Sequence, residues 1–239
     1  MPVSSFNKSL RADFVPLMKQ DGWTKLTARE FGRIRNRLFQ WIAISIDGRG
    51  STKRVLVEFG AQPLATRSIS MSMNVGGRFW AGSSEWRSMR DKEGAERVVQ
   101  AMCEEWRARV CDWMNSVLDV SGFLDAVNSK EIPNQPYDRF YVACLCAERE
   151  QLKDAESWFR RAKQSFDDTF GQNPYAEWAK EHSTLCDLAV KRIEESNIAN
   201  LLADWRRFTY DQLELEKWFG DAQTSLAEQD AAGNPLPDM

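Results

Sequence analysis

The chain has 239 residues, 28% of them charged, and a net charge of -3 at pH 7. That length suffices for one large or two small domains with a real hydrophobic core, and 43% apolar residues argue against wholesale disorder. The balance of charge provides no overall basic field, so nucleic-acid binding is disfavoured. Ten tryptophans raise the expectation of a recognition surface, because Trp is enriched at binding hot spots.

Cysteine usage and hydropathy predict the compartment. Five scattered cysteines do not form a disulfide framework. The first residues, MPVSSFNKSLRADF, lack the apolar core of a signal peptide, and the sequence has no run of about 18 apolar residues. We therefore expect a cytoplasmic protein that has no membrane partner.

The N-terminal pattern predicts one helix followed by strands. Ser4 or Ser5 can cap a helix with apolar residues at helical spacing from Phe6 to Met18, in which Pro16 favours a kink or an early end. The predicted strands are Trp23–Ala28, Phe31–Arg35, Leu38–Ile46 and Arg54–Phe59.

The segment Thr66–Val75 reads TRSISMSMNV and has the most regular pattern of the chain. Its apolar residues alternate with serines and an asparagine. Because side chains on a strand point alternately to opposite faces, this pattern predicts a strand with one apolar and one small polar face. We expect this strand to complete an antiparallel meander.

A long amphipathic helix is predicted from Asp91, after an aperiodic segment at Gly76–Met89 that is expected to be a loop or an irregular sheet edge. The apolar stripe of this helix comprises Ala95, Val99, Met102, Trp106, Val110, Trp113 and Val117. The fold class that follows is α+β, with the antiparallel meander covered by this helix.

The chain beyond Ile132–Pro136 is predicted to be entirely helical. Two prolines within that segment indicate a boundary. The expected helices are Tyr137–Arg149, Leu152–Phe170, Tyr175–Glu195 and Ile198–Phe219. The resulting domains are 1–131, a sheet-and-helix domain, 132–219, a helical bundle, and 220–239, a flexible polar tail.

The N-terminal half carries a family resemblance. Its order of helix, strands and long helix includes Gly22-Trp23, Phe31-Gly32-Arg33, Trp41–Ile46 and a loop that contains Trp86. This order resembles a bacterial family of small α+β domains of unknown function, the DUF4304 type. No activity is assigned to that family, and its members resemble proteins encoded near toxin–immunity and defence systems. The resemblance transfers no catalytic residue.

A second resemblance covers Phe140–Phe166. Ala143, Ala155, Phe159 and Ala162 fall where the tetratricopeptide pattern places its small and aromatic packing residues, with the turn at 151–154. The next pair of helices does not repeat the pattern, and a solenoid needs about three stacked units. We therefore expect a single helical hairpin that is similar to one repeat unit.

The only histidine, His182, lies one turn before Cys186 on one helical face. A zinc site would need Cys144 and Cys146 as its other half, but residues two apart on a helix point about 200° away from one another. We therefore predict buried, inert cysteines and no metal or cofactor.

Two further features are candidates for chemistry. Residues 47–53 (DGRGSTK) have neither the spacing nor the following helix of a phosphate-binding loop, so a hairpin turn is the better interpretation. Asp47 and Glu58 flank adjacent strands, as acidic metal ligands do in some nucleases. A metal-dependent hydrolase or nuclease that uses these two residues is therefore the alternative function.

The leading candidate for partner binding is the cluster Arg78, Phe79, Trp80, Trp86 and Arg87. Arg and Trp dominate interface energetics, and here they lie on a glycine-rich loop. The competing interpretation is that Trp80 and Trp86 fill the end of the core. We expect a non-enzymatic cytoplasmic binding protein, a toxin-neutralising immunity protein or a defence-system component that occludes a protein partner. A helical scaffold protein acting through Tyr137–Phe219 is the remaining alternative.

Overall fold

A computed structural model describes residues 2–49, 52–72, 74–80, 85–129 and 135–220. The chain divides into two compact units that alternate along the sequence. The sheet unit comprises Met1–Arg35, Phe39–Ala61 and Gly76–Ser116, and the helical unit comprises Asn36–Leu38, Gln62–Val75 and Val117–Met239. The expected α+β fold class is confirmed.

The described strands form one six-stranded antiparallel sheet in the order β1-β2-β3-β4-β5, with β6 paired to β4. They are β1 Thr24–Lys25, β2 Glu30–Arg35, β3 Leu38–Asp47, β4 Arg54–Pro63, β5 Gly76–Arg78 and β6 Arg87–Ser88. The β2–β3 turn is formed by Asn36 and Arg37, whose φ angles are 49° and 64°. Two positive φ values in a two-residue loop match the twist of a β-hairpin. The segment 76–89, expected to be a loop or an irregular edge, has a short strand near each end, and both strands pair with β4. Its residues 81–84 lie outside the described part.

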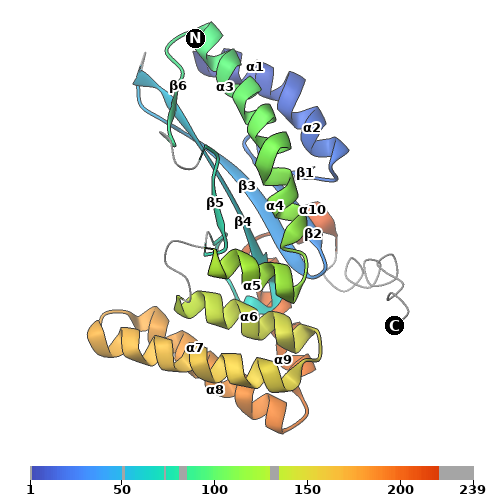
Figure 1. The fold of residues 1–239 in the computed structure, drawn as a ribbon, viewed down its shortest axis with the longest axis vertical. Helices are drawn as coiled ribbons and strands as arrows, with labels where there is room; N and C mark the ends of the chain where they lie inside the picture. The colour runs from blue at the N-terminus through green and yellow to red at the C-terminus, as the bar shows by residue number, and fades with distance from the viewer. Residues whose placement is uncertain (1, 50–51, 73, 81–84, 130–134, 221–239) are drawn as a thin grey trace. The chain divides into compact units, whose positions relative to one another are not determined.

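Two helical layers cover one face of this sheet (Figure 1). The N-terminal layer runs through α1 Pro2–Ser9, a π-turn Leu10–Phe14 and α2 Val15–Gln20. Pro16 therefore does not end the helix, and a π-turn precedes it where the proline ring would otherwise meet the preceding turn. The second layer runs through α3 Lys92–Glu105, a π-turn Trp106–Val110 and α4 Cys111–Ser116.

The predicted long helix is amphipathic in the expected way. Asp91 caps α3 by accepting a hydrogen bond from the Gly94 N–H at 2.6 Å. Ala95, Val99 and Trp106 are completely buried against the strands of the sheet unit. The prediction of a sheet covered by this helix is confirmed.

The prediction of a strand over 66–75 is wrong. Leu64–Thr66 forms a 3-10 turn, Arg67 adopts a left-handed conformation with φ 52°, and the described residues from 68 to 75 form no strand. Ile69 is 71% exposed, so no continuous apolar face exists. The polar residues satisfy the backbone instead: the Ser68 N–H donates to Thr209 Oγ1 at 3.0 Å, and the Ser72 N–H donates to Gln62 Oε1 at 2.8 Å.

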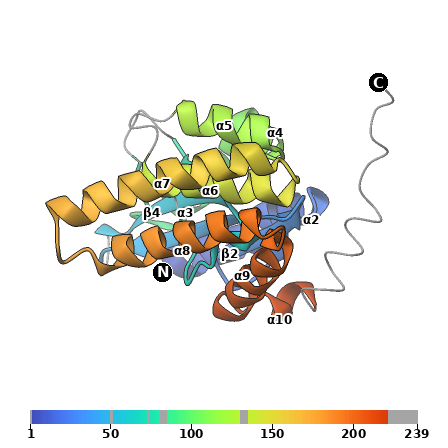
Figure 2. The ribbon, with the colours of Figure 1, turned by 90° about the horizontal axis from the view of Figure 1, so that it is seen from below.

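The helical unit is built from successive helices, as expected. They are α5 Val120–Asn128, α6 Pro136–Glu148, α7 Leu152–Gln172, α8 Glu177–Glu194, α9 Ile198–Gln212 and α10 Glu216–Phe219. Figure 2 shows α6, α7 and α8 running side by side, with α9 turned away from them. The residues of the repeat-like hairpin, Ala143, Ala155, Phe159 and Ala162, are all fully buried. The predicted boundary at 132–136 and the predicted tail lie mostly outside the described residues.

Candidate functional site

The sequence-predicted loop cluster is divided between core and surface. Phe79 is fully buried and Trp80 is 8% exposed, and both belong to the core of the sheet unit. The two rings contact each other edge to face at 5.9 Å, and the Trp80 N–H donates to Glu105 Oε1 at 3.2 Å. Phe79 and Trp80 are therefore core residues, and partner binding through them stays a prediction.

The other three residues of that cluster make ion pairs and cation–π contacts. Arg78 pairs with Glu58 at 3.2 Å and with Glu85 at 2.5 Å. The Arg54 guanidinium lies 4.5 Å from the ring centroid of Trp86, which is partly exposed. Arg87 lies over Trp80 at 5.0 Å. Partner binding by Arg78, Trp86 and Arg87 stays a prediction.

Asp47 and Glu58 belong to separate ion pairs. Arg54 binds Asp47 at 2.8 Å, and its hydrogen bond is the main reason that the pKa of Asp47 is lowered. Glu58 lies four residues further along β4 than Arg54, about 13 Å at the rise of a strand, and is paired with Arg78. Gly60, where a nuclease-type lysine would stand, lies against the Trp41 ring, and a Cβ there would come within 2.8 Å of it.

The cysteines are unpaired thiols. Burial is the main cause that raises the pKa of all five, which are Cys103, Cys111, Cys144, Cys146 and Cys186. A raised pKa keeps the thiol protonated and unreactive. Across the described residues, no three His, Cys, Asp or Glu side chains are placed to hold a metal ion together.

A pocket that the sequence did not predict lies within the helical unit. Its volume is about 510 Å³. One wall is the segment that follows the 3-10 turn, and the other comes from α6, α8 and α9. Its lining residues are Arg67, Ser68, Ile69, Ser70, Met71, Ser72, Asn74, Tyr137, Tyr141, Trp178, Glu181, His182 and Phe208. We call it the serine–aromatic pocket.

Aromatic rings form the helical wall of the pocket. Tyr137 and Trp178 stack at 5.4 Å with an interplanar angle of 18°. The His182 ring meets Tyr137 edge to face at 4.8 Å and also contacts Phe166 at 5.2 Å. Such stacked and edge-to-face pairs fix the ring orientations. Burial is the main cause that raises the pKa of Tyr137 to about 12, so its phenol stays neutral.

The serine-rich segment is tied to α6 through Tyr141, which is only 2% exposed. Burial raises the pKa of Tyr141, and hydrogen bonds with Ser72, Asn74 and Ser68 partly oppose that effect. Ser68 Oγ also lies 2.7 Å from Thr66 Oγ1. The polar residues of the predicted strand thus line the pocket and fix the segment to the helices.

His182 is held as a neutral imidazole. Burial is the main cause that lowers its pKa below 6.5. Its Nδ1 lies 2.7 Å from the Trp178 carbonyl oxygen, which can only accept a hydrogen bond. Nδ1 must therefore carry the proton, and Nε2 is left as an acceptor.

One ion pair supplies the formal charges of the pocket. Arg67 binds Glu181 at 2.8 Å, and the Arg67 guanidinium lies 4.3 Å from the ring centroid of Phe208. With His182 neutral, the lining contains one cation and one anion that neutralise each other.

Two exposed apolar side chains belong to the pocket lining. In the described part of the chain, the large hydrophobic residues that are exposed are Ile69 at 71%, Tyr175 at 93% and Trp178 at 43%. Ile69 and Trp178 line the pocket, and Tyr175 lies three residues before Trp178. A cluster of this composition is typical of a binding surface.

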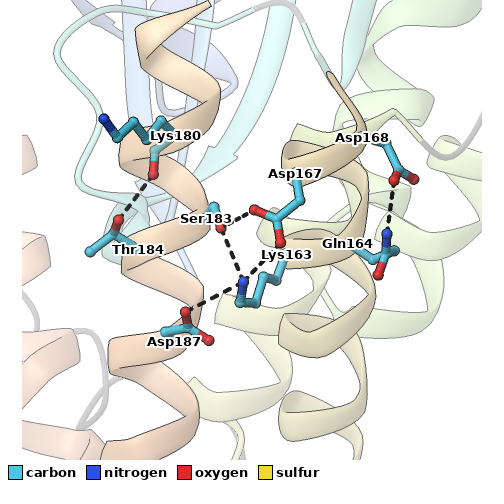
Figure 3. Close-up of polar contacts among 8 residues, drawn as sticks. All are labelled: Lys163, Gln164, Asp167, Asp168, Lys180, Ser183, Thr184 and Asp187. Atoms are coloured by element: carbon cyan, nitrogen blue, oxygen red, sulfur yellow. Dashed lines mark hydrogen bonds and ion pairs between the residues drawn. The ribbon is translucent and has the colours of Figure 1, made fainter. Parts of the chain in front are cut away.

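A polar cluster between α7 and α8 superficially resembles a serine–lysine catalytic pair (Figure 3). Ser183 donates to Asp167 at 2.5 Å, and Lys163 contacts Asp167 at 2.8 Å and Asp187 at 3.5 Å. The hydrogen bond to Asp167 is the main reason that the pKa of Lys163 is raised. A lysine that retains its proton cannot act as a base toward Ser183, so this cluster joins the two helices.

The sequence contained part of the signal for the serine–aromatic pocket. The alternation at 66–75 and the aromatic positions on the predicted helices were visible, but their proximity depends on tertiary structure. Within the described residues, no helix is both long and apolar enough to cross a bilayer. Comparisons with family models, with curated proteins and with solved structures found no match.

Proposed function

We propose that this protein is a non-enzymatic binding protein that contacts a protein partner through the serine–aromatic pocket and its apolar rim. The rim consists of Ile69, Tyr175 and Trp178. The observation that carries the proposal is that these three residues are the exposed large hydrophobic side chains of the described chain, and that two of them line a pocket. Tyr and Trp at a concave surface supply large contact areas at little conformational cost.

The chemistry of the pocket also supports binding over catalysis. Its histidine and Tyr137 are held in their neutral forms, and its arginine and glutamate neutralise one another. These groups can donate and accept hydrogen bonds and offer ring faces. The five free thiols suit a reducing compartment, so a cytoplasmic location is part of the proposal.

The proposed class of binding protein is a toxin-neutralising immunity protein or a defence-system component. This part of the proposal rests on the family resemblance of the N-terminal half. The mechanism would be occlusion, in which a preformed surface covers the active site of the partner. If the partner is an enzyme, its inhibition by this protein should be complete at a one-to-one ratio and should be competitive with substrate.

The test compares variants of the full chain in quantitative affinity capture from host extract, followed by calorimetry with the purified partner. Ile69→Ser and Tyr175→Ser remove exposed apolar surface without touching the core, and each should weaken binding several-fold. Trp178→Ala should weaken it at least tenfold, which corresponds to about 1.4 kcal/mol. Trp86→Ala, in the sheet unit, is the matched control and should bind as the wild type does.

Two results would contradict the proposal. A partner that binds all three rim variants with wild-type affinity would show that the rim is not the interface. Loss of binding in Trp86→Ala alone would instead assign the interface to the loop predicted from the sequence.

A further inference from the structure

The serine–aromatic pocket has the size of a ligand site. Its volume of about 510 Å³ lies within the range of about 300–1,000 Å³ that is usual for pockets that take small ligands or anchoring segments. The lining combines exposed ring surface with hydroxyl groups. A pocket of this kind orients its ligand by a few polar contacts and gains affinity from apolar contact.

The charges of the lining disfavour an ionic ligand. Arg67 and Glu181 already bind each other at 2.8 Å, and His182 is neutral. The two opposite charges cancel, so an ion entering the pocket would meet about as much repulsion as attraction. A charged group would therefore lose contacts with water without a net electrostatic gain from the lining, which favours a neutral ligand.

The remaining contacts match a flat ring with a polar end. Trp178 is stacked on Tyr137 and retains 43% exposure, so ring surface is available to a ligand. Ser70, Ser72 and Asn74 of the serine-rich segment line the same pocket, and Ser72 and Asn74 also hydrogen-bond with Tyr141. A hydroxyl group both donates and accepts a hydrogen bond, as does each of these serines.

We infer that the serine–aromatic pocket is the anchor site for a neutral tyrosine side chain of the protein partner. The phenol ring lies against Trp178, and its hydroxyl reaches the serine-rich segment. This inference rests on the proposed function and specifies which partner residue the pocket takes. A tyrosine so placed would be the hot spot of the interface.

The test uses the ¹⁵N-labelled full chain and N-acetyl-L-tyrosinamide as the probe in an NMR titration. We expect saturable shifts in the amides of 67–72 and in the Trp178 indole N–H, with a dissociation constant on the order of 1 mM for so small a ligand. N-acetyl-L-phenylalaninamide should bind at least threefold more weakly. The O-phosphorylated tyrosine amide should bind at least tenfold more weakly, because it brings charge into a neutral pocket.

Variants of the pocket give the control. Trp178→Ala should abolish the saturable shifts, and Trp178→Phe should restore binding to within about threefold because a ring face remains. Trp158→Ala, at a partly exposed position of α7 that does not line the pocket, should leave the titration unchanged. Absence of saturable shifts in the wild type, or tighter binding of the phosphorylated probe, would overturn the inference. A partner that still binds through the rim while the tyrosine probe does not would refute the anchor residue and leave the proposed function standing. A partner indifferent to all rim variants would refute the proposed function itself.

Discussion

The protonation of His182 links the pocket to pH. Its folded pKa is lowered chiefly by burial, so the unfolded chain binds the proton more tightly than the folded chain does. The contribution of His182 to stability should therefore be constant above about pH 7, and it should fall as the pH drops through 6.5 toward the folded pKa. Because His182 is the only histidine, a single imidazole signal in an NMR titration reports it directly, with an apparent pKa below 6.5.

The matched variant is His182→Asn, whose amide can still donate to the Trp178 carbonyl. When the pH is lowered from 7.5 to 5.5, the unfolding free energy of the wild type should decrease relative to that of the variant, as measured by urea unfolding. A difference that does not change with pH would mean that His182 titrates equally in the folded and unfolded chains.

Arg33 on β2 is the second residue whose role depends on burial. It is 3% exposed, and it donates to Gln40 Oε1 at 2.7 Å, to the Asp21 carbonyl at 3.2 Å and to Asn115 Oδ1 at 2.9 Å. Burial is the main cause that lowers its pKa to about 10. Three acceptors in different directions match the guanidinium fork, which a lysine ammonium cannot reproduce.

Arg33→Lys should therefore destabilise the protein by about 2–4 kcal/mol, because buried acceptors lose their donors. Urea unfolding followed by circular dichroism measures the change. Arg35→Lys is the control on the same strand, since Arg35 is exposed, and it should alter stability by less than about 0.5 kcal/mol. Equal effects of the two substitutions would show that the network around Arg33 contributes nothing specific.

Helix ends in the helical unit depend on strained residues. Glu150, Ser196 and Glu214 follow α6, α8 and α9 with φ angles of 59°, 55° and 51°. After α8, the Asn197 N–H donates to the Arg192 carbonyl and the Ser196 N–H to the Ile193 carbonyl, which is the bonding of a Schellman motif. Glycine is the residue that adopts this left-handed conformation without strain.

Ser196→Gly should stabilise the protein by about 0.5 kcal/mol. The backbone strain that glycine relieves should contribute more free energy than the additional conformational entropy that glycine gives the unfolded chain. Ser196 is exposed, so the substitution removes no packing. Thermal unfolding provides the measurement, and Ser196→Ala serves as the control because alanine keeps the strain. If alanine stabilised as much as glycine, the left-handed conformation would not be the cause.

Periodicity predicted some elements correctly and failed for one instructive segment. The apolar stripes predicted α3 and α6–α9 correctly, because a helix that packs against a core has apolar residues on the same side at every turn. The segment 66–75 alternates as a strand does, but Ser68 and Ser72 hydrogen-bond with Tyr141, and the Ser68 N–H donates to Thr209. Alternation did not predict burial here, because the apolar residue Ile69 is 71% exposed. It also does not reveal whether the backbone partner is another strand.

The candidate site was less predictable than the fold. Trp80 and Trp86 lie close together in the same glycine-rich segment, yet Trp80 is buried and Trp86 is partly exposed. The pocket combines residues more than a hundred positions apart, such as Arg67 and Glu181. A single sequence carries no direct signal for such a pairing. The loop cluster was therefore predicted as the candidate site, and the pocket was not predicted.

The division of the whole chain into two units explains why a linear domain boundary is hard to read. The helical unit includes Gln62–Val75, which lies within the N-terminal half of the sequence. The buried cluster of the sheet unit contains residues from Phe6 to Met114, all of which belong to the segments of that unit. In the helical unit, the 3-10 turn at Leu64–Thr66 packs against α6 and α9, and α5 packs against α6. The 64–75 segment and α5 therefore depend on helices that follow them in sequence.

Removing residues 132–239 should accordingly unfold parts of what remains. Leu64, Ala65, Phe123 and Val127 are almost fully buried in the intact chain and would lose the helices that cover them. Hydrogen exchange read by mass spectrometry should show fast exchange for 62–75 and 117–129 in the fragment, with 39–61 and 92–116 as slow as in the intact protein. Fast exchange throughout the fragment would show that the sheet unit needs the helical unit to fold. Slow exchange throughout would show that the 62–75 segment holds its conformation without Tyr141 and Thr209. One wall of the serine–aromatic pocket would then form independently of the helices that supply the other wall.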